Sequence, residues 1–214
     1  MLKLKKTNYV FIYSLYLIIF WGFYRMRVNL PLGVEEFLIK PIIWLLPIVF
    51  ILVKENKRAD SLYFSGKGLF PSTFLAIALG VGFAIEGLVV NFFKYKELSF
   101  VFMDGGRSFY WVFIISIATA FTEEISFRGY IFSRLWKKYG NELKANLISS
   151  FIWVLVHLPI AIFFWKLNFI SLVIFSILLA MFGIGSAFLV GRTKNIFSSI
   201  LLHVFWGWPI VLFR

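Results

Sequence analysis

Long apolar runs, separated by short polar and basic segments, dominate the pattern of this 214-residue chain. Seven of these runs approach the roughly 20 residues that an α-helix needs to cross a lipid bilayer. They cover residues 9–24, 37–53, 70–93, 109–127, 145–165, 169–190 and 196–213. Within them, apolar and polar residues do not alternate strictly, as they would in a membrane β-barrel. The pattern therefore predicts an all-α protein, a polytopic transmembrane helical bundle of about seven spans.

The composition agrees with a membrane protein. Hydrophobic residues make up 61% of the chain and charged residues only 15%, whereas a soluble domain is nearer half apolar and a quarter charged. The chain has no cysteine, which excludes disulfides, a thiol nucleophile and a thiolate metal site. The net charge of +12 comes largely from Lys and Arg in short loops. Such loops favour anionic lipid headgroups as partners rather than nucleic acid.

The basic residues also predict an orientation. If the N-terminus is cytoplasmic, the inside segments hold about twice as many Lys and Arg as the outside segments, as the positive-inside rule requires. We therefore expect an integral protein of the cell membrane with a cytoplasmic N-terminus and a retained first helix. Lys40 lies within the second run and is expected to snorkel towards a span end. With this topology we expect the site to open to the cytoplasmic half of the membrane.

Two adjacent carboxylates close the fourth run. Glu123 and Glu124 stand there, and Arg128 follows Glu124 by four residues, so that Glu124 and Arg128 can pair on one helix face. Glu123 lies about 100° around the helix and is free for another partner. The two histidines of the chain, His157 and His203, lie inside later apolar runs. Charged groups at membrane depth are costly and usually functional, so we expect Glu123, His157 and His203 to converge.

Taken alone, these residues leave several chemistries open. Glu123, helped by His157, could act as a general base on water, with His203 stabilising an oxyanion. Glu123, His157 and His203 could instead bind a catalytic zinc, or form a proton relay in a transporter. In a purely structural alternative, Glu124–Arg128 is a helix-end ion pair and the histidines are ordinary bundle residues.

Three further features have structural interpretations. Gly183, Ala187 and Gly191 form a small-residue stripe, which is typical of close helix packing. Pro159 is expected to kink the fifth span. Glu86, alone in the third run, is expected to pair with a polar group of the bundle or to line the cavity.

The motifs resemble those of a known family. Glu123-Glu-Ile-Ser-Phe-Arg128 is similar to the Glu-Glu-x-x-x-Arg motif of the CPBP family, the CAAX-protease and bacteriocin-processing (Abi) membrane proteins. Trp153-Val-Leu-Val-His157 resembles the family's Phe-x-x-x-His motif, with Trp for Phe, and Ser198-Ser-Ile-Leu-Leu-His203 resembles its last His-bearing helix. The resemblance predicts a protease core in residues 108–214, preceded in residues 1–107 by three spans similar to the family's variable part.

The resemblance implies an intramembrane glutamic endopeptidase that cleaves a membrane-associated or lipidated peptide or protein. It implies that Glu123 and His157 activate the water, that His203 stabilises the oxyanion, and that Glu124 and Arg128 support the site. We expect no cofactor, with a zinc-dependent mechanism as the alternative. The chain departs from the family at Gly207, where Asn or Asp is usual. Ser199 could replace that donor; otherwise the protein is a catalytically weak bacteriocin-immunity or scaffold protein or, less expected, a proton-coupled transporter.

Overall fold

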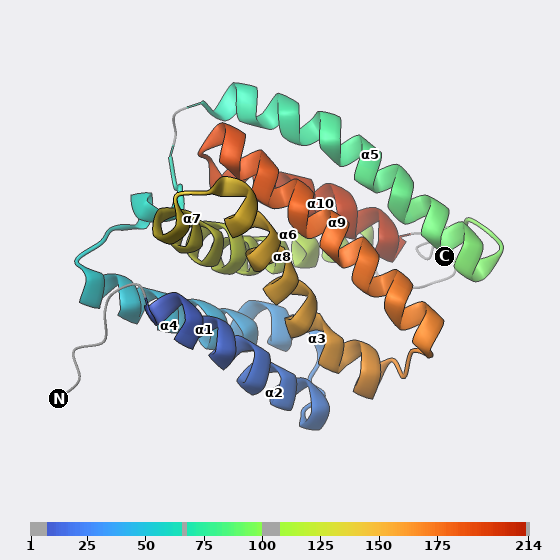
Figure 1. Ribbon diagram of the computed structural model, residues 1–214. Coiled ribbons are helices and arrows are strands. Elements are labelled where there is room, and N and C mark those ends of the chain that lie inside the picture. Colours follow the sequence, from blue (N-terminus) through green and yellow to red (C-terminus); the bar gives the residue numbers. More distant parts are fainter. Residues whose placement is uncertain (1–7, 66–67, 100–107, 213–214) are drawn as a thin grey trace.

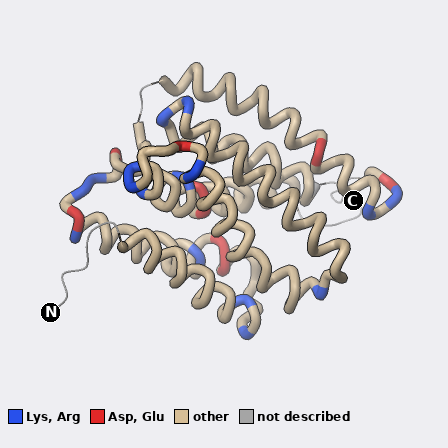
Figure 2. The backbone as a smooth tube through the Cα atoms, viewed as in Figure 1, with Lys and Arg blue, Asp and Glu red and all other residues tan. Residues whose placement is uncertain are grey.

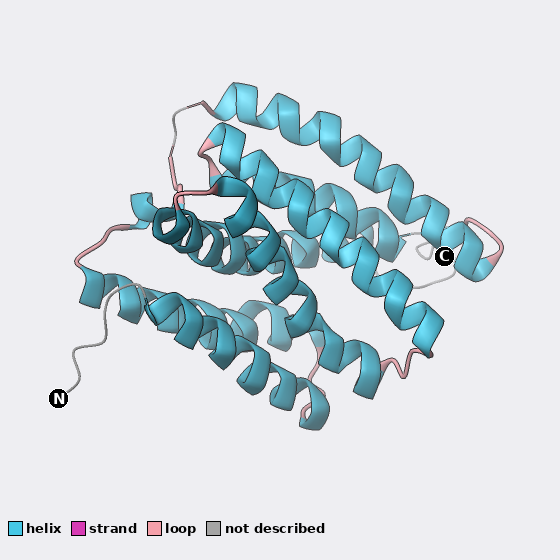
Figure 3. Ribbon diagram, viewed as in Figure 1, coloured by secondary structure: helices cyan, strands magenta, loops and turns pink. Residues whose placement is uncertain are grey.

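The computed structural model describes residues 8–65, 68–99 and 108–212, and these ranges contain helices and loops but no strand (Figures 1 and 3). Six helical rods are long and apolar enough to cross a membrane. They span Tyr9–Arg27, Leu32–Glu55, Leu69–Tyr95, Phe109–Tyr139, Glu142–Phe164 and Phe169–Thr193. The seventh predicted run forms a shorter apolar helix, α10 (Ile196–Leu212). The prediction of an all-α polytopic bundle is confirmed.

Several rods are divided into α-helical and π-helical parts. The first consists of α1 (Tyr9–Tyr16), η2 (Leu17–Trp21) and α2 (Gly22–Arg27), and the second of α3 (Leu32–Val34), η3 (Glu35–Ile39) and α4 (Lys40–Glu55). After the 3-10 turn η4 (Ala59–Leu62) come α5 (Leu69–Tyr95), then α6 (Phe109–Glu124), η5 (Ile125–Phe132) and α7 (Ser133–Tyr139). The rest are α8 (Glu142–Pro159), η6 (Ile160–Phe164), α9 (Phe169–Thr193) and α10. π-Helical segments are often found at functional sites, and η3, η5 and η6 all adjoin the site described below.

The rods pack around a central group of helices. α10 contacts α5 on one side and α6 on another, and α9 packs against α8, while α2 reaches α8 from the opposite side of the bundle (Figure 1). Buried aromatic rings connect the elements: Trp44 of α4 contacts Phe127 of η5, which contacts Trp153 of α8. Outward-facing side chains such as Phe70 and Phe169 are exposed and apolar, as expected of a surface in contact with lipid tails.

The fourth rod differs from its prediction. It was expected to end at residue 127, with Arg128 in the following cytoplasmic segment, but the helix continues to Tyr139 and Arg128 is buried at 1% exposure. The physical reason is that Glu124 neutralises Arg128 one turn earlier on the same helix.

Several basic residues on which the predicted orientation depends lie outside the described residues. They are Lys3, Lys5, Lys6, Lys67, Arg107 and Arg214, as is residue 213 at the end of the last predicted run.

The small-residue stripe brings α9 close to α8. A Cβ placed on Gly183 would lie 3.0 Å from the Cβ of Ser150, and one on Gly191 would meet the carboxylate of Glu142. Ala187, between them, is fully buried. The interpretation of this stripe as a packing surface is therefore confirmed, and it fixes the wall of the bundle behind α8.

Candidate active site

Glu123, the penultimate residue of α6, is buried in a cluster of charges from two rods. Its Oε1 accepts a hydrogen bond from Lys40 Nζ at 2.7 Å. The same ammonium lies 2.8 and 2.7 Å from the two carboxylate oxygens of Glu36, one of which also accepts from the Thr119 hydroxyl at 2.6 Å. The sequence predicted that Lys40 snorkels towards a span end, and this prediction is wrong. Lys40 is 5% exposed and turned inward, because two carboxylates compensate its charge within the bundle.

His157 faces the other oxygen of Glu123. Its Nδ1 lies 2.8 Å from the Trp153 carbonyl, and because a carbonyl oxygen only accepts, Nδ1 carries the hydrogen. In the neutral ring, Nε2 is then an acceptor, and it lies 3.7 Å from Glu123 Oε2. This separation is too long for a direct hydrogen bond. A water molecule between the two atoms could donate one hydrogen to each, which is the arrangement expected of an activated water.

Glu124 holds the second histidine. His203 Nδ1 lies 2.9 Å from Glu124 Oε1, and the other carboxylate oxygen accepts from the Ser186 hydroxyl at 2.6 Å. Arg128 donates to the same carboxylate at 3.2 Å and to the Gly183 carbonyl at 3.3 Å. Glu124 is 0% exposed, and these three protein groups surround its carboxylate. The adjacent glutamates thus have different surroundings, since Glu123 borders a cavity and Glu124 is enclosed.

Trp153 fixes the relative position of the two histidines. Its ring lies 4.3 Å from that of His157 and 5.6 Å from that of His203, measured between centroids. The guanidinium of Arg128 stacks over the same ring at 4.7 Å, a favourable cation–π geometry. The Trp153 indole nitrogen has no hydrogen-bond partner among the described residues. The ring therefore acts through packing.

The side chains predicted to converge all line one cavity. It has a volume of about 580 Å³ and includes Glu123, His157 and His203, a size typical of ligand-binding pockets. Its other lining residues come from the segment between the end of η2 and the start of α4, from α6, from the end of α8 through η6 to Trp165, and from α10. They are Trp21, Arg25, Asn29, Leu30, Leu32, Glu35, Glu36, Lys40, Val112, Ile115, Ser116, Thr119, Val156, Ile160, Phe164, Trp165, Gly207 and Val211. Arg25 and Glu35 form an ion pair beside this lining.

The direction of the cavity differs from the expectation. Its outer lining residues, Asn29, Leu30 and Trp165, lie at the end of the bundle opposite to Tyr9, where the first helix begins. A site reached from the same side as the N-terminus was predicted. That side is closed because Phe127 and Tyr130 of η5, both fully buried, fill the space beyond Glu123.

Ser199 and Gly207 lie in different surroundings. Gly207 stands where the family motif has Asn or Asp, and Ser199 was expected to replace the donor that is absent there. Ser199 donates to the Ile196 carbonyl at 2.9 Å and is not part of the cavity lining, so it does not replace the donor. Gly207 does line the cavity. A Cβ built on Gly207 would find only His203 Cδ2 within 4 Å, at 3.9 Å, which leaves room for a larger side chain.

The donor groups do not form a metal-binding set. Among the described residues, no group of three or more His, Cys, Asp or Glu side chains is placed to share a metal ion. The set considered for zinc, Glu123, His157 and His203, also has the Lys40 ammonium 2.7 Å from its carboxylate, where it would repel a divalent cation. We therefore derive no step through a metal.

Two residues of this site, Glu36 and Lys40, were missed in the sequence. Their signal was present, because they are opposite charges at i and i+4 at the start of an apolar run. Glu86 instead pairs with the Trp206 indole at 3.0 Å, outside the cavity, which confirms the expectation of a polar partner in the bundle.

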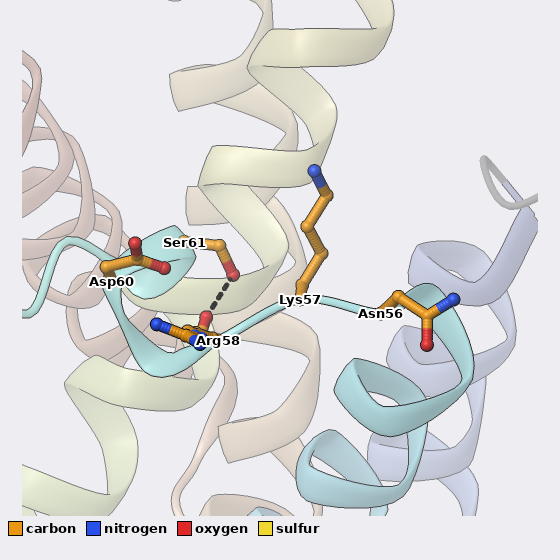
Figure 4. A pocket seen from close by; sticks show the side chains of 5 residues that line it. All are labelled: Asn56, Lys57, Arg58, Asp60 and Ser61. Carbon is orange, nitrogen blue, oxygen red and sulfur yellow. Dashed lines mark hydrogen bonds between the residues drawn. The ribbon is translucent and has the colours of Figure 1, made fainter.

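Most other charged residues lie near helix ends (Figure 2). A second pocket, of about 420 Å³, lies among them on the loop after α4, where Ser61 donates to the Arg58 carbonyl at 2.7 Å (Figure 4). It is lined by Asn56, Lys57, Arg58, Asp60 and Ser61. Because none of these residues contacts Glu123 or the histidines, this pocket is not part of the site.

Comparisons with known proteins place these observations in a family. Comparison with curated proteins gives no match. Residues 105–208, which contain Glu123, His157 and His203, match the model of the Rce1-like type II CAAX prenyl endopeptidases. Lys40 and Glu36 lie outside the matched region. Residues 105–208 are therefore similar to the Rce1-like CAAX prenyl endopeptidases, which confirms the resemblance of the motifs to the CPBP family.

Proposed function

We propose that this protein is an intramembrane endopeptidase that cleaves a membrane-associated or lipidated peptide or protein with a water molecule activated by Glu123 and His157. The observation that carries the proposal is the 3.7 Å separation between Glu123 Oε2 and His157 Nε2 at the inner end of the cavity. The family match supports the same reaction class.

In this proposal Lys40 is a positioning residue. Its hydrogen bond occupies Glu123 Oε1, which leaves Oε2 as the oxygen that faces the water. Glu123 takes a proton from the water as the oxygen attacks the peptide carbonyl carbon. His157 accepts the water's second hydrogen bond and orients it. When the C–N bond breaks, Glu123 returns the proton to the leaving amine, so that protons balance over the cycle.

His203 and Glu124 would stabilise the intermediate. Glu124 accepts from His203 Nδ1 at 2.9 Å and so fixes the orientation of the ring. When both ring nitrogens carry a hydrogen, Nε2 can donate to the oxyanion that forms on the carbonyl oxygen. One donor of this kind is worth about 10²–10³ in rate. Arg128 and Ser186 hold Glu124 in place.

The test is cleavage by the purified protein in detergent or liposomes, with a prenylated CAAX-type peptide and an unprenylated apolar peptide as alternative substrates. We expect Glu123→Gln, His157→Ala and His203→Ala each to abolish cleavage while the protein still accumulates in the membrane. Glu86→Gln is the matched control, because Glu86 is also a bundle glutamate but lies outside the cavity. Full activity in any of the three variants would remove that residue from the mechanism.

One observation favours a second candidate, a catalytically weak bacteriocin-immunity or scaffold protein. Gly207 provides no donor beside His203, and Ser199 is turned away. If neither type of peptide is cleaved, and the Glu123→Gln protein protects cells against a peptide as well as the wild type does, this candidate is supported instead.

A further inference from the structure

We propose that the substrate enters from the extracytoplasmic face of the membrane, so that its cleaved segment belongs to an exported or outward-facing membrane-anchored peptide. The choice of substrate rests on the proposed function. The direction of entry rests on geometry and charge alone, and it can be tested without any catalytic assay.

The cavity runs along one half of the bundle. On α6 its lining residues Val112, Ile115, Thr119 and Glu123 follow the i, i+3, i+4 spacing of a single helix face. They cover about 16 Å at 1.5 Å per residue. The lining residues of α10 are His203, Gly207 and Val211, each one turn beyond the last in the same direction. Both rows of lining residues, on α6 and on α10, lead from the site towards the loop that contains the exposed Asn29.

The opposite direction is blocked. On the side of Glu123 away from the cavity, η5 packs four large side chains into the core. They are Phe127, Tyr130, Ile131 and Phe132, and each is 0% exposed. No residue of α7 or of the first two turns of α8 lines the cavity. Glu123 lies near the middle of its rod, about 21 Å along the helix from Phe109, so a substrate must come in through the open half.

The distribution of charge assigns that open half to the outside. Among the described residues, the closed end of the bundle holds about twice as many Lys and Arg side chains as the open end. At the closed end they are Lys54, Lys57, Arg58, Arg134, Lys137, Lys138, Lys144, Arg192 and Lys194, and at the open end Arg25, Arg27, Lys94, Lys96 and Lys166. The closed end therefore faces the cytoplasm by the positive-inside rule.

The lining also indicates what kind of segment fits. Between the mouth and the site the walls include Leu32, Ile115 and Ile160, which suit apolar side chains. The two cations of the lining, Arg25 and Lys40, are both paired with carboxylates. No described lining residue thus offers an unpaired cation for a free C-terminal carboxylate. An extended, apolar internal segment of an exported peptide is the class that this chemistry accepts.

Single cysteines test the direction of entry, because the native chain contains none. Asn29→Cys probes the mouth and Ser116→Cys the wall, and both residues line the cavity. Lys137→Cys, exposed at the closed end, is the matched control. Each full-length variant is treated in intact cells with a membrane-impermeant maleimide and again after permeabilisation. We expect complete labelling of the first two in intact cells, and labelling of Lys137→Cys only after permeabilisation.

Labelling of Asn29→Cys only after permeabilisation would overturn the proposal. So would a Ser116→Cys protein that stays unlabelled under both conditions, because the path from the mouth to the site would then be missing. The two proposals fail separately. If Asn29→Cys is labelled in intact cells but no peptide is ever cleaved, only the endopeptidase proposal falls. If peptides are cleaved but Asn29→Cys is reached from the cytoplasm, only the direction of entry falls.

Discussion

Lys40 Nζ and Glu123 Oε1 lie 2.7 Å apart in the interior of the bundle, although 83 residues separate them in the sequence. Buried charges persist when they are paired and hydrogen-bonded, and removing one partner of such a pair costs about 3–5 kcal/mol. Lys40 meets this condition with two carboxylates, Glu36 and Glu123. With two carboxylates and one ammonium, the cluster of Lys40, Glu36 and Glu123 carries a net charge of −1. Lys40 binds Oε1 of Glu123, and the other oxygen, Oε2, lies beside His157.

Replacing Lys40 by methionine should lower kcat more than it changes KM. The side chain keeps its length but loses the ammonium, so Glu123 can rotate, and a misplacement of about 1 Å can cost about 100-fold in rate. We therefore expect kcat to fall while KM stays near the wild-type value, because the lining that binds the substrate is otherwise unchanged. Steady-state kinetics of peptide cleavage check this.

Lys40→Arg is the control, because it restores a cation and should restore kcat. Both variants keep the other charged or titratable groups that face Glu123, which are Arg25, Glu36, Arg128, His157 and His203. A Lys40→Met protein with the wild-type kcat would show that Lys40 has no role beyond stability.

The two adjacent glutamates should differ in what their loss affects. Glu124→Ala leaves Arg128 buried without its carboxylate, so we expect the free energy of unfolding to fall by about 3–5 kcal/mol. Glu123→Gln keeps an acceptor for Lys40 and should unfold near the wild-type temperature while losing activity. Thermal unfolding in detergent, read beside cleavage, checks both. Equal melting of Glu124→Ala and wild type would contradict the structural role assigned to Glu124.

Removal of metal ions should leave activity intact. The donors lack the arrangement of a metal site, and Lys40 repels a cation next to Glu123. We expect full cleavage after prolonged treatment with a strong chelator, and no stoichiometric metal in the purified protein. Zinc recovered at one ion per chain, together with activity lost on chelation and restored by zinc, would show that the glutamic mechanism is wrong.

Gly207→Asn should raise turnover. The amide would stand one helical turn beyond His203 and could donate to the same oxyanion. The structure has room for it, because a Cβ at Gly207 approaches His203 no closer than 3.9 Å. A donor of this kind is worth up to about 10²–10³ in rate. Gly207→Ala adds bulk without a donor and is the comparison. If Asn slows cleavage as much as Ala does, the site is built around the glycine.

The fold could largely be predicted from the sequence, because the length of an apolar run reports directly on the bilayer. The Glu124–Arg128 pair could be predicted as well, since it depends only on helical spacing. Lys40 could not. The second run is apolar on nearly every side, so periodicity does not reveal which face meets the bundle, and a lysine near its start is equally compatible with snorkelling.

The direction of the cavity was also beyond the sequence. Glu123 lies near the middle of a long rod, from which either end of the bundle is about equally distant. Which end is open depends on where bulky side chains pack. The rings of Phe127 and Tyr130 fill one side, and their inward direction depends on the packing of η5 against its neighbours rather than on any local pattern.

The position of Lys40 and Glu36 has a consequence for how the protein could be divided. The chain before residue 105 contributes the ammonium, and the part that matches the family contributes the carboxylate and both imidazoles. The second part alone would bury Glu123 without its counter-charge, whereas the first part keeps Lys40 paired with Glu36. The proposed active site is thus assembled from two separate parts of the chain. If the chain before residue 105 and the chain from residue 105 onward are inserted as separate fragments into one membrane, each should lack activity. The pairing of Lys40 with Glu123 should favour their association.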